Sequence, residues 1–178
     1  VMNPKTGEIV TLANYPDFDP NAYQKEKDIR VFNNSAIFDL YEPGSTFKVL
    51  QIAAGIDAGK ITPGMTFHDS GSIKIGNYTI NNFENHAYGD LTVTQAIEKS
   101  DNVVMTQIAQ LLGADLINNY FDRFGLRKLT GIDIARESEN HIKPAKEWKE
   151  IDVATSGFGQ GVTLTPIQLV TSIASLAN

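Results

Sequence analysis

The segment YEPGSTFK, residues 41–48, constrains the fold of this chain more than any other stretch. Its Pro-Gly pair marks a turn, because proline cannot continue a preceding helix and glycine permits a tight bend before the next one. The apolar side chains that follow recur with helical spacing: Val49, Leu50, Ile52, Ala53 and Ile56. We therefore expect a helix that starts at or beside Ser45 and buries one face.

Ser45 and Lys48 have the spacing of a serine nucleophile and its base. Positions three apart lie on one face of a helix, so we expect Lys48 Nζ to reach Ser45 Oγ. A serine hydroxyl is a poor nucleophile until a neighbouring base takes its proton. Burial and the positive end of the helix dipole would both disfavour the ammonium and lower the pKa of Lys48. Backbone N–H groups at the helix N-terminus would bind an oxyanion.

An S-x-x-K pair taken alone also fits a simpler structure, in which the serine caps the helix and the lysine is solvated. The triplet Ser100-Asp101-Asn102 is equally ambiguous alone, because Ser100 or Asp101 would be an ordinary N-cap. Together and in this order, the two motifs match two of the three that mark penicillin-binding proteins and class A β-lactamases. The pair therefore favours acyl-transfer chemistry over capping alone.

The net charge and the residue types that are absent narrow the chemistry further. A formal net charge of -6 and a pI near 5.0 argue against nucleic acid or an anionic membrane as a main partner. The lack of cysteine excludes disulfides, thiol catalysis and thiolate metal sites. His68, His86 and His141 are not spaced as a metal pair, so we expect no metal and no cofactor.

The remaining signals predict a helix-rich chain with a few strands. Hairpins are expected within residues 1–14 and 73–80, whereas residues 82–90 and 126–155 are expected to be mostly loop. The glycine-rich turn at residues 157–161 lacks the context of a phosphate loop and is expected to support the fold. Helices are predicted from capping and periodicity at residues 92–99, 103–112, 115–124 and from Thr165-Pro166 onward.

Longer stretches of the chain resemble the transpeptidase domain of class B penicillin-binding proteins, the cell-wall D,D-transpeptidases. YEPGSTFK matches the nucleophile motif of that family over its full length. The resemblance is collinear along nearly the whole chain and extends to PKTGEIVTLANYPDFDPN at residues 4–21, GDLTVTQAIEKSDNVVM at residues 89–105 and GFGQGVTLTPIQLVTSIASLAN at residues 157–178.

The resemblance implies a role for each motif residue. Ser45 would be the acylated nucleophile, its backbone N–H would form half of the oxyanion hole, and Lys48 would be its base. Ser100 would relay a proton between Lys48 and the leaving amine, and Asn102 would bind the amide of the substrate or of a β-lactam. The implied substrates are peptidoglycan stem peptides ending in D-Ala-D-Ala, with carboxypeptidase activity as a side reaction and β-lactams as covalent inhibitors.

The resemblance also implies an α+β fold of the serine β-lactamase and penicillin-binding-protein transpeptidase class. The K-T-G motif of that family lies on a strand downstream of the final helix, and the sequence ends at Asn178 before it. Lys5-Thr6-Gly7 has the same letters but is expected in a hairpin turn. Residues 1–178 are therefore expected to be a helix-rich, partial domain, truncated at both ends, without most of the central antiparallel sheet, and weak or inactive alone.

Two alternative functions remain. A class D β-lactamase also uses S-T-F-K, but its second motif ordinarily has valine where Asn102 stands, so Asn102 and the YEPG lead-in argue against it. A non-catalytic β-lactam sensor or cell-division scaffold would retain the fold without turnover. The expected location is the outer face of a bacterial cytoplasmic membrane, with cell-wall synthesis or division membrane proteins as partners through regions outside this chain.

Overall fold

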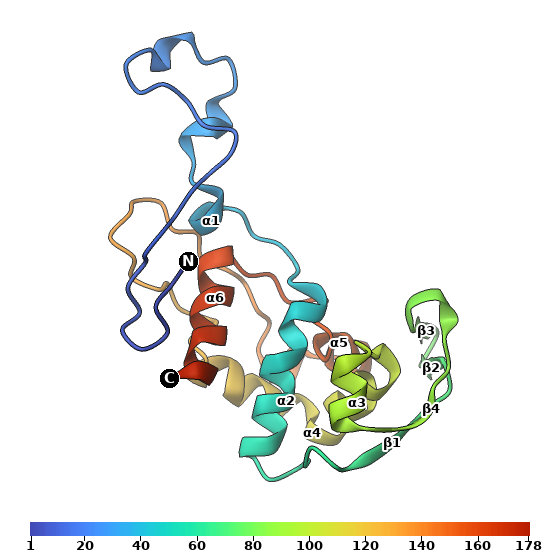
Figure 1. Ribbon diagram of the computed structural model, residues 1–178. Coiled ribbons are helices and arrows are strands. Elements are labelled where there is room, and N and C mark those ends of the chain that lie inside the picture. The colour runs from blue at the N-terminus through green and yellow to red at the C-terminus, as the bar shows by residue number, and fades with distance from the viewer.

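Helices make up most of the regular structure in the computed structural model, which describes residues 1–178 (Figure 1). The α-helices are α1 (Ser35–Phe38), α2 (Lys48–Asp57), α3 (Val93–Glu98), α4 (Asn102–Arg123), α5 (Glu150–Ser156) and α6 (Pro166–Ala174). The strands are β1 (Thr66–Asp69), β2 (Ser72–Ile75), β3 (Tyr78–Asn81) and β4 (Gly89–Thr92). Two small antiparallel sheets, β1–β4 and β2–β3, complete a helix-rich α+β fold, as predicted.

Local capping signals placed several helices correctly. The Thr92 side chain accepts from Gln95 N while the Gln95 side chain accepts from Thr92 N, and this capping box opens α3. The same arrangement at Thr165, with Pro166 in the first turn, opens α6. The two helices predicted on either side of Gly113 share the label α4, but the break predicted between them is confirmed, because Gly113 has φ +74° and ψ 164°, outside the helical region, and the helix is kinked there.

Two segments that were predicted to be loops contain regular elements. In both, the element is stabilised by contacts with a part of the chain that is distant in the sequence. Within the first, residues 82–90, the chain already enters β4 at Gly89, because β4 pairs with β1 in the register Asp69 opposite Gly89. The second, residues 126–155, contains all but the last residue of α5. This helix lacks a serine or threonine cap at its start, where Asp152 Oδ2 accepts a hydrogen bond from Lys149 N at 2.7 Å instead. This short helix packs on α4.

The predicted hairpins are confirmed. β2 and β3 pair around the Gly76-Asn77 turn. Near the N-terminus a bridge joins Met2 to Ile9, and Gly7 N donates to Asn3 O at 2.9 Å, so Lys5-Thr6-Gly7 lies in the hairpin turn as expected. The chain beyond this hairpin, up to α1, forms a long loop that extends away from the helices (Figure 1).

One buried cluster lies where α2 packs against α4 and α6 (Figure 1). Phe47 and Leu50 supply its α2 side, Met105 and Ile108 its α4 side, and Leu169 its α6 side. Burial of apolar side chains in such a cluster makes the main favourable contribution to the free energy of folding. The core therefore fixes the start of α2, where the YEPGSTFK segment lies.

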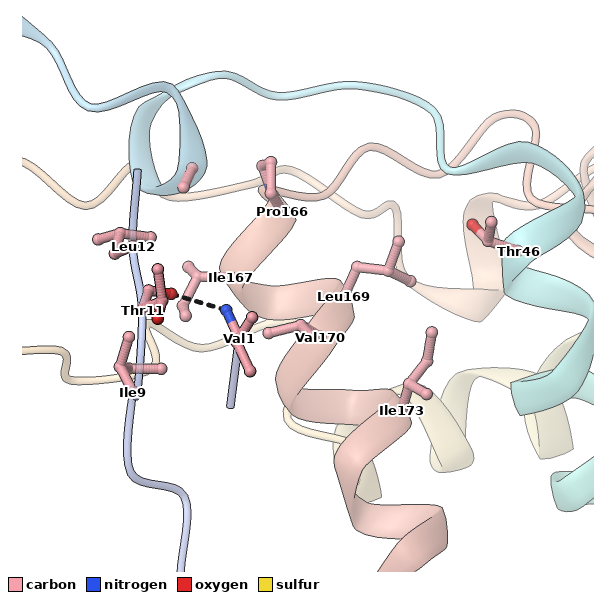
Figure 2. Close-up of a pocket in the computed structure, with 11 residues that line it drawn as sticks. Val1, Ile9, Thr11, Leu12, Thr46, Pro166, Ile167, Leu169, Val170 and Ile173 are labelled. Atoms are coloured by element: carbon pink, nitrogen blue, oxygen red, sulfur yellow. Dashed lines mark hydrogen bonds between the residues drawn. The ribbon is translucent and has the colours of Figure 1, made fainter. Parts of the chain in front are cut away.

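An apolar pocket of about 370 Å³ lies between α6 and the N-terminal hairpin (Figure 2). Figure 2 shows Ile167 and Val170 of α6 on the side of Val1, and Leu169 and Ile173 on the opposite side of the helix, facing α2. The rest of the lining includes Thr46 from the turn that precedes α2. None of the predicted site residues lines this pocket, so the predicted site lies elsewhere in the molecule.

Candidate active site

Ser45 lies in a tight turn that leads directly into α2. Residues Gly44–Phe47 form a 3-10 turn, in which side chains three apart lie on the same side. Phe47 is fully buried and anchors the turn in the core, whereas Ser45 is exposed. The Ser45 backbone N–H has no acceptor among the protein's hydrogen bonds, so it is available to an oxyanion.

The glycine-rich turn at residues 157–161 packs against the Ser45 turn. It therefore supports the fold, as predicted. Gly44 N donates to Gly159 O at 3.1 Å, and Glu42 Oε1 accepts from Gly161 N at 2.8 Å. A Cβ on Gly159 would overlap Gly44 O and lie 2.7 Å from Phe47 Cβ. Only glycine permits this approach, particularly at the φ of +74° that Gly159 adopts.

Lys48 links the two predicted motifs. Its Nζ donates to Ser100 O at 2.6 Å, lies 3.0 Å from Ser100 Oγ and donates to Asn102 Oδ1 at 2.8 Å. The lysine is only 1% exposed. The structure therefore brings together three of the four predicted site residues, from positions more than fifty apart in the sequence.

No hydrogen bond joins Lys48 Nζ to Ser45 Oγ, although both residues lie on the same side of the turn. Catalytic hydrogen bonds often form only when substrate is bound. The direct contact between Ser45 and Lys48, the predicted nucleophile and base, stays a prediction.

The protonation state of Lys48 is shifted toward the neutral amine. Burial lowers the pKa of Lys48 from 10.5 to about 8, although the negative charge of Asp101 opposes this shift. Ser100 O and Asn102 Oδ1 can only accept hydrogen bonds, whereas the Ser100 hydroxyl can donate or accept. A neutral Lys48 would keep both carbonyl contacts and accept the Ser100 proton, so this arrangement can pass a proton in either direction.

Ser100 has a backbone conformation that is uncommon for a residue with a side chain. Its φ is +54°, and it follows the C-cap of α3. Ser100 N donates to Ile97 O at 3.1 Å and Asp101 N to Ala96 O at 2.9 Å, which is the Schellman pattern usually completed by glycine. This turn leaves Ser100 exposed beside Lys48. Asp101, not Ser100, caps α4, since its Oδ1 accepts from Val104 N at 2.7 Å.

Asn102 is held from two sides. Its Nδ2 donates to Asn81 O at 3.0 Å while its Oδ1 accepts from Lys48. A hollow of about 440 Å³ lies beside it, between β3, α5 and the glycine-rich turn. Its lining mixes apolar and polar side chains: Tyr78, Thr79, Ile80, Asn81, Asn102, Ile151, Thr155, Phe158 and Gln160. A peptide bound along this hollow would pass the Asn102 amide.

Sequence reasoning missed Asp69 and Asn82, which lie directly behind Asn102. Asn82 Oδ1 accepts from Asn102 N at 2.8 Å, and Asn82 Nδ2 donates to Asp69 Oδ1 at 2.9 Å. Asn82 belongs to a polar segment that was expected to be a loop, and nothing in the local sequence marks it as buried.

Other candidates do not form sites. His86 and Glu84 lie 3.9 Å apart on the surface, and no group of three or more His, Cys, Asp or Glu side chains in residues 1–178 could hold a metal ion. None of the helices combines the length and the hydropathy that a transmembrane segment needs.

The sequence of this chain is similar to those of proteins from a known family. The family model described as the penicillin binding protein transpeptidase domain matches residues 1–178. Among curated proteins, Stage V sporulation protein D of Bacillus subtilis is 34% identical over 99% of this chain and 28% of its own length. Peptidoglycan D,D-transpeptidase FtsI of Escherichia coli is 28% identical over 100% of this chain and 30% of its own length.

The fold is also similar to that of solved structures of penicillin-binding proteins and related enzymes. Pseudomonas aeruginosa PBP2, solved in complex with WCK 5153, superposes with a TM-score of 0.89 at 30% identity and covers 99% of this chain and 45% of its own. A peptidoglycan glycosyltransferase from Burkholderia ambifaria has a TM-score of 0.86 at 25% identity, covering 99% of this chain and 51% of its own. The chain thus spans less than a third of these curated relatives and about half of these solved ones.

Proposed function

The chain belongs to the penicillin-binding-protein transpeptidase family, and we propose that the full-length protein is a peptidoglycan D,D-transpeptidase that acts through an acyl ester on Ser45. The observation that carries this proposal is the buried Lys48, with a pKa lowered to about 8 and its amine against Ser100 and Asn102. The relatives named as D,D-transpeptidases support the same reaction. The substrates are peptidoglycan stem peptides that end in D-Ala-D-Ala.

Acylation begins with neutral Lys48 as the base. Lys48 takes the proton of the Ser45 hydroxyl as Oγ attacks the carbonyl carbon of the penultimate D-Ala. The negative charge of the resulting tetrahedral oxyanion is stabilised by the Ser45 N–H, which has no other acceptor. Lys48 is then protonated and the C–O bond of the ester has formed.

Collapse of the intermediate needs a proton on the leaving amine. Lys48 Nζ is 3.0 Å from Ser100 Oγ, so Ser100 accepts a proton from Lys48 as it donates its own to the D-Ala nitrogen. The C–N bond breaks and the terminal D-Ala leaves. An amine from a neighbouring stem peptide then attacks the ester by the reverse steps and forms the cross-link, whereas attack by water would give carboxypeptidase activity.

Asn102 binds the amide of the substrate next to the reacting carbonyl. Its side chain is already oriented by Asn81 O and Lys48. A β-lactam presents a similar amide and acylates Ser45, but its leaving nitrogen stays attached and the ester persists. The Asn102 contact with Lys48 supports a transpeptidase rather than a class D β-lactamase, whose second motif ordinarily has valine at this position.

The proposed place of action is the bacterial cell envelope, at the outer face of the cytoplasmic membrane, where the substrate peptides are cross-linked. FtsI, the name that several relatives carry, supports a role in cell division. Membrane proteins of cell-wall synthesis or division are the proposed partners, bound through regions outside residues 1–178.

Labelling of the full-length protein with a fluorescent penicillin tests this proposal. We expect a stable adduct whose intact mass and peptide map place it on Ser45, and no adduct in Ser45→Ala. Rapid turnover of the drug by the wild type would indicate a β-lactamase instead. A folded wild type that is neither labelled nor able to release D-Ala from a stem peptide would overturn the acyl-enzyme proposal.

A further inference from the structure

Three buried polar side chains lie behind the Lys48, Ser100 and Asn102 cluster. Asp69, Asn82 and Asp101 are 1%, 7% and 1% exposed, and no step of the proposed reaction uses them. They come from the end of β1, the residue after β3 and the N-cap of α4. Burying two carboxyl groups this close together is costly unless hydrogen bonds compensate for the lost water.

The amide nitrogen of Asn82 provides that compensation. Nδ2 lies 2.9 Å from Asp69 Oδ1, 2.8 Å from Asp101 Oδ2 and 3.0 Å from His86 O, so its two N–H groups donate to these three acceptors and one of them is shared. Backbone N–H groups satisfy the remaining carboxyl oxygens: Tyr88 N donates to Asp69 and Val104 N donates to Asp101. The two carboxyl groups are therefore joined through a single side chain.

The amide oxygen of Asn82 has a different task. Oδ1 accepts from Asn102 N at 2.8 Å and from Val103 N at 3.2 Å. The first N–H groups of a helix have no acceptor within the helix, so an outside acceptor fixes where the helix begins. An amide side chain offers N–H donors to the carboxyl pair and a carbonyl acceptor to α4 at once.

Because Asn82 holds the backbone of Asn102, it also determines where the Asn102 side chain meets Lys48. Resting on the function proposed above, we propose that Asn82 is a positioning residue for acyl transfer, which bridges Asp69 and Asp101 and thereby fixes Asn102 and Ser100 against Lys48. It touches no reacting atom. Displacing reacting groups by about 1 Å is enough to cost roughly a hundredfold in rate.

The bridge also affects the charge beside Lys48. Burial raises the pKa of Asp101, the neighbouring Asp69 carboxylate raises it further, and the donors Val104 N and Asn82 Nδ2 counteract both. Without Asn82, Asp101 would lose one of the donors that lower its pKa. Asn82 therefore favours the charged form of Asp101 beside Lys48, in addition to its role in geometry.

The test compares the rates at which a fluorescent penicillin acylates variants of the full-length protein. We expect Asn82→Ala to lower the second-order rate constant by about tenfold or more, because Asn102 is released. Asn77→Ala is the matched control, since Asn77 is exposed in the β2–β3 turn, and it should stay within about twofold of wild type. Equal rates for the two variants would overturn the proposal.

Asn82→Asp distinguishes positioning from a loss of folding and decides the question if Asn82→Ala does not fold. It keeps the acceptor for α4 but places a third carboxyl group against Asp69 and Asp101, with Lys48 as the nearby cation. The added negative charge should raise the Lys48 pKa and move the half-maximal pH upward, so the rates are compared on the plateau at high pH, where Lys48 is neutral in both proteins. We expect the plateau rate of Asn82→Asp to be about tenfold below that of wild type, because the donor to the carboxyl pair is lost, whereas an equal plateau rate would contradict the bridge.

The two proposals fail in different ways. A wild type and an Asn77→Ala variant that both lack acylation would overturn the acyl-transfer function itself. Acylation that is normal in these two and also in Asn82→Ala would overturn only the positioning role of Asn82.

Discussion

The protonation of Lys48 controls the first step of the proposed reaction. A base must be neutral to take the Ser45 proton, and burial lowers the pKa of Lys48 to about 8 while Asp101 holds it up. Below that pH the ammonium dominates and acylation is slow. Above it the neutral amine dominates and the rate reaches a plateau. The acylation rate should therefore increase with pH.

We predict that the rate of acylation by a penicillin rises with pH and is half-maximal near the Lys48 pKa of about 8. Asp101→Asn should shift the midpoint to lower pH, since removing the negative charge removes the contribution that raises the Lys48 pKa. Asparagine is as good an N-cap as aspartate, so α4 should stay intact. Stopped-flow or gel-based acylation between about pH 6 and pH 10 measures both midpoints. A midpoint that moves upward in Asp101→Asn would contradict this electrostatic account.

Ser100 combines backbone strain with a proposed role as a proton relay, and two substitutions separate these two properties. Ser100→Gly should raise the free energy of unfolding by about 1 kcal/mol, because glycine tolerates the φ of +54°. Ser100→Ala keeps the strain and should not stabilise. Both variants lose the hydroxyl that is proposed to relay a proton, and both should turn over a stem peptide roughly a hundredfold more slowly.

Urea unfolding and D-Ala release measure these two effects independently. Ser100→Gly and Ser100→Ala of equal stability would argue against strain at Ser100. Full activity in either variant would remove the proposed relay.

At the scale of elements, the turn before α2 depends on contact with a distant glycine. Gly159→Ala should lower the acylation rate by about tenfold or more, because the added methyl group displaces Gly44 and with it the Ser45 turn. Gly64→Ala is the matched control: Gly64 has an ordinary φ, and a Cβ there would meet no atom within 4 Å. Labelling rates of the two variants, compared at equal folded concentration, test the contact. Wild-type labelling by Gly159→Ala would show that the turn does not need it.

Which elements could be predicted from sequence depends on how far apart their determinants lie. The capping boxes at Thr92 and Thr165 are complete within four residues, so the starts of α3 and α6 could be read directly. β4 exists because β1 lies beside it, about twenty residues earlier, and α5 exists because α4 covers it. Such elements leave little local signal.

The same distinction applies to the site. Ser45, Lys48, Ser100 and Asn102 could be predicted because short motifs carry them, and the structure brings Lys48 to Ser100 and Asn102. Asn82 could not be predicted, because its hydrogen-bond partners come from β1, from the loop after β3 and from α4. Its role follows from tertiary contacts that no single stretch of sequence encodes.

At the scale of the whole molecule, the Ser45 turn and the core pack together as one unit. The Phe47 ring packs edge-on against Phe121 of α4 with 5.5 Å between centroids, and Phe121 in turn packs against Trp148. Phe47 is also the neighbour of Lys48 in the chain and contacts the glycine-rich turn. A cavity at this position should therefore affect both global stability and the chemistry.

We predict that Phe47→Ala lowers the free energy of unfolding by about 3–5 kcal/mol, the usual cost of removing a fully buried aromatic ring. Phe83→Ala is the matched control: Phe83 is 82% exposed, and its loss should change stability by no more than about 0.5 kcal/mol. Urea unfolding followed by circular dichroism gives the free energies, and penicillin labelling along the same titration reports the active site. Because one core supports both, labelling and helicity should be lost together in each protein. Labelling lost well before helicity in wild type would mean that the Ser45 turn unfolds independently of the core.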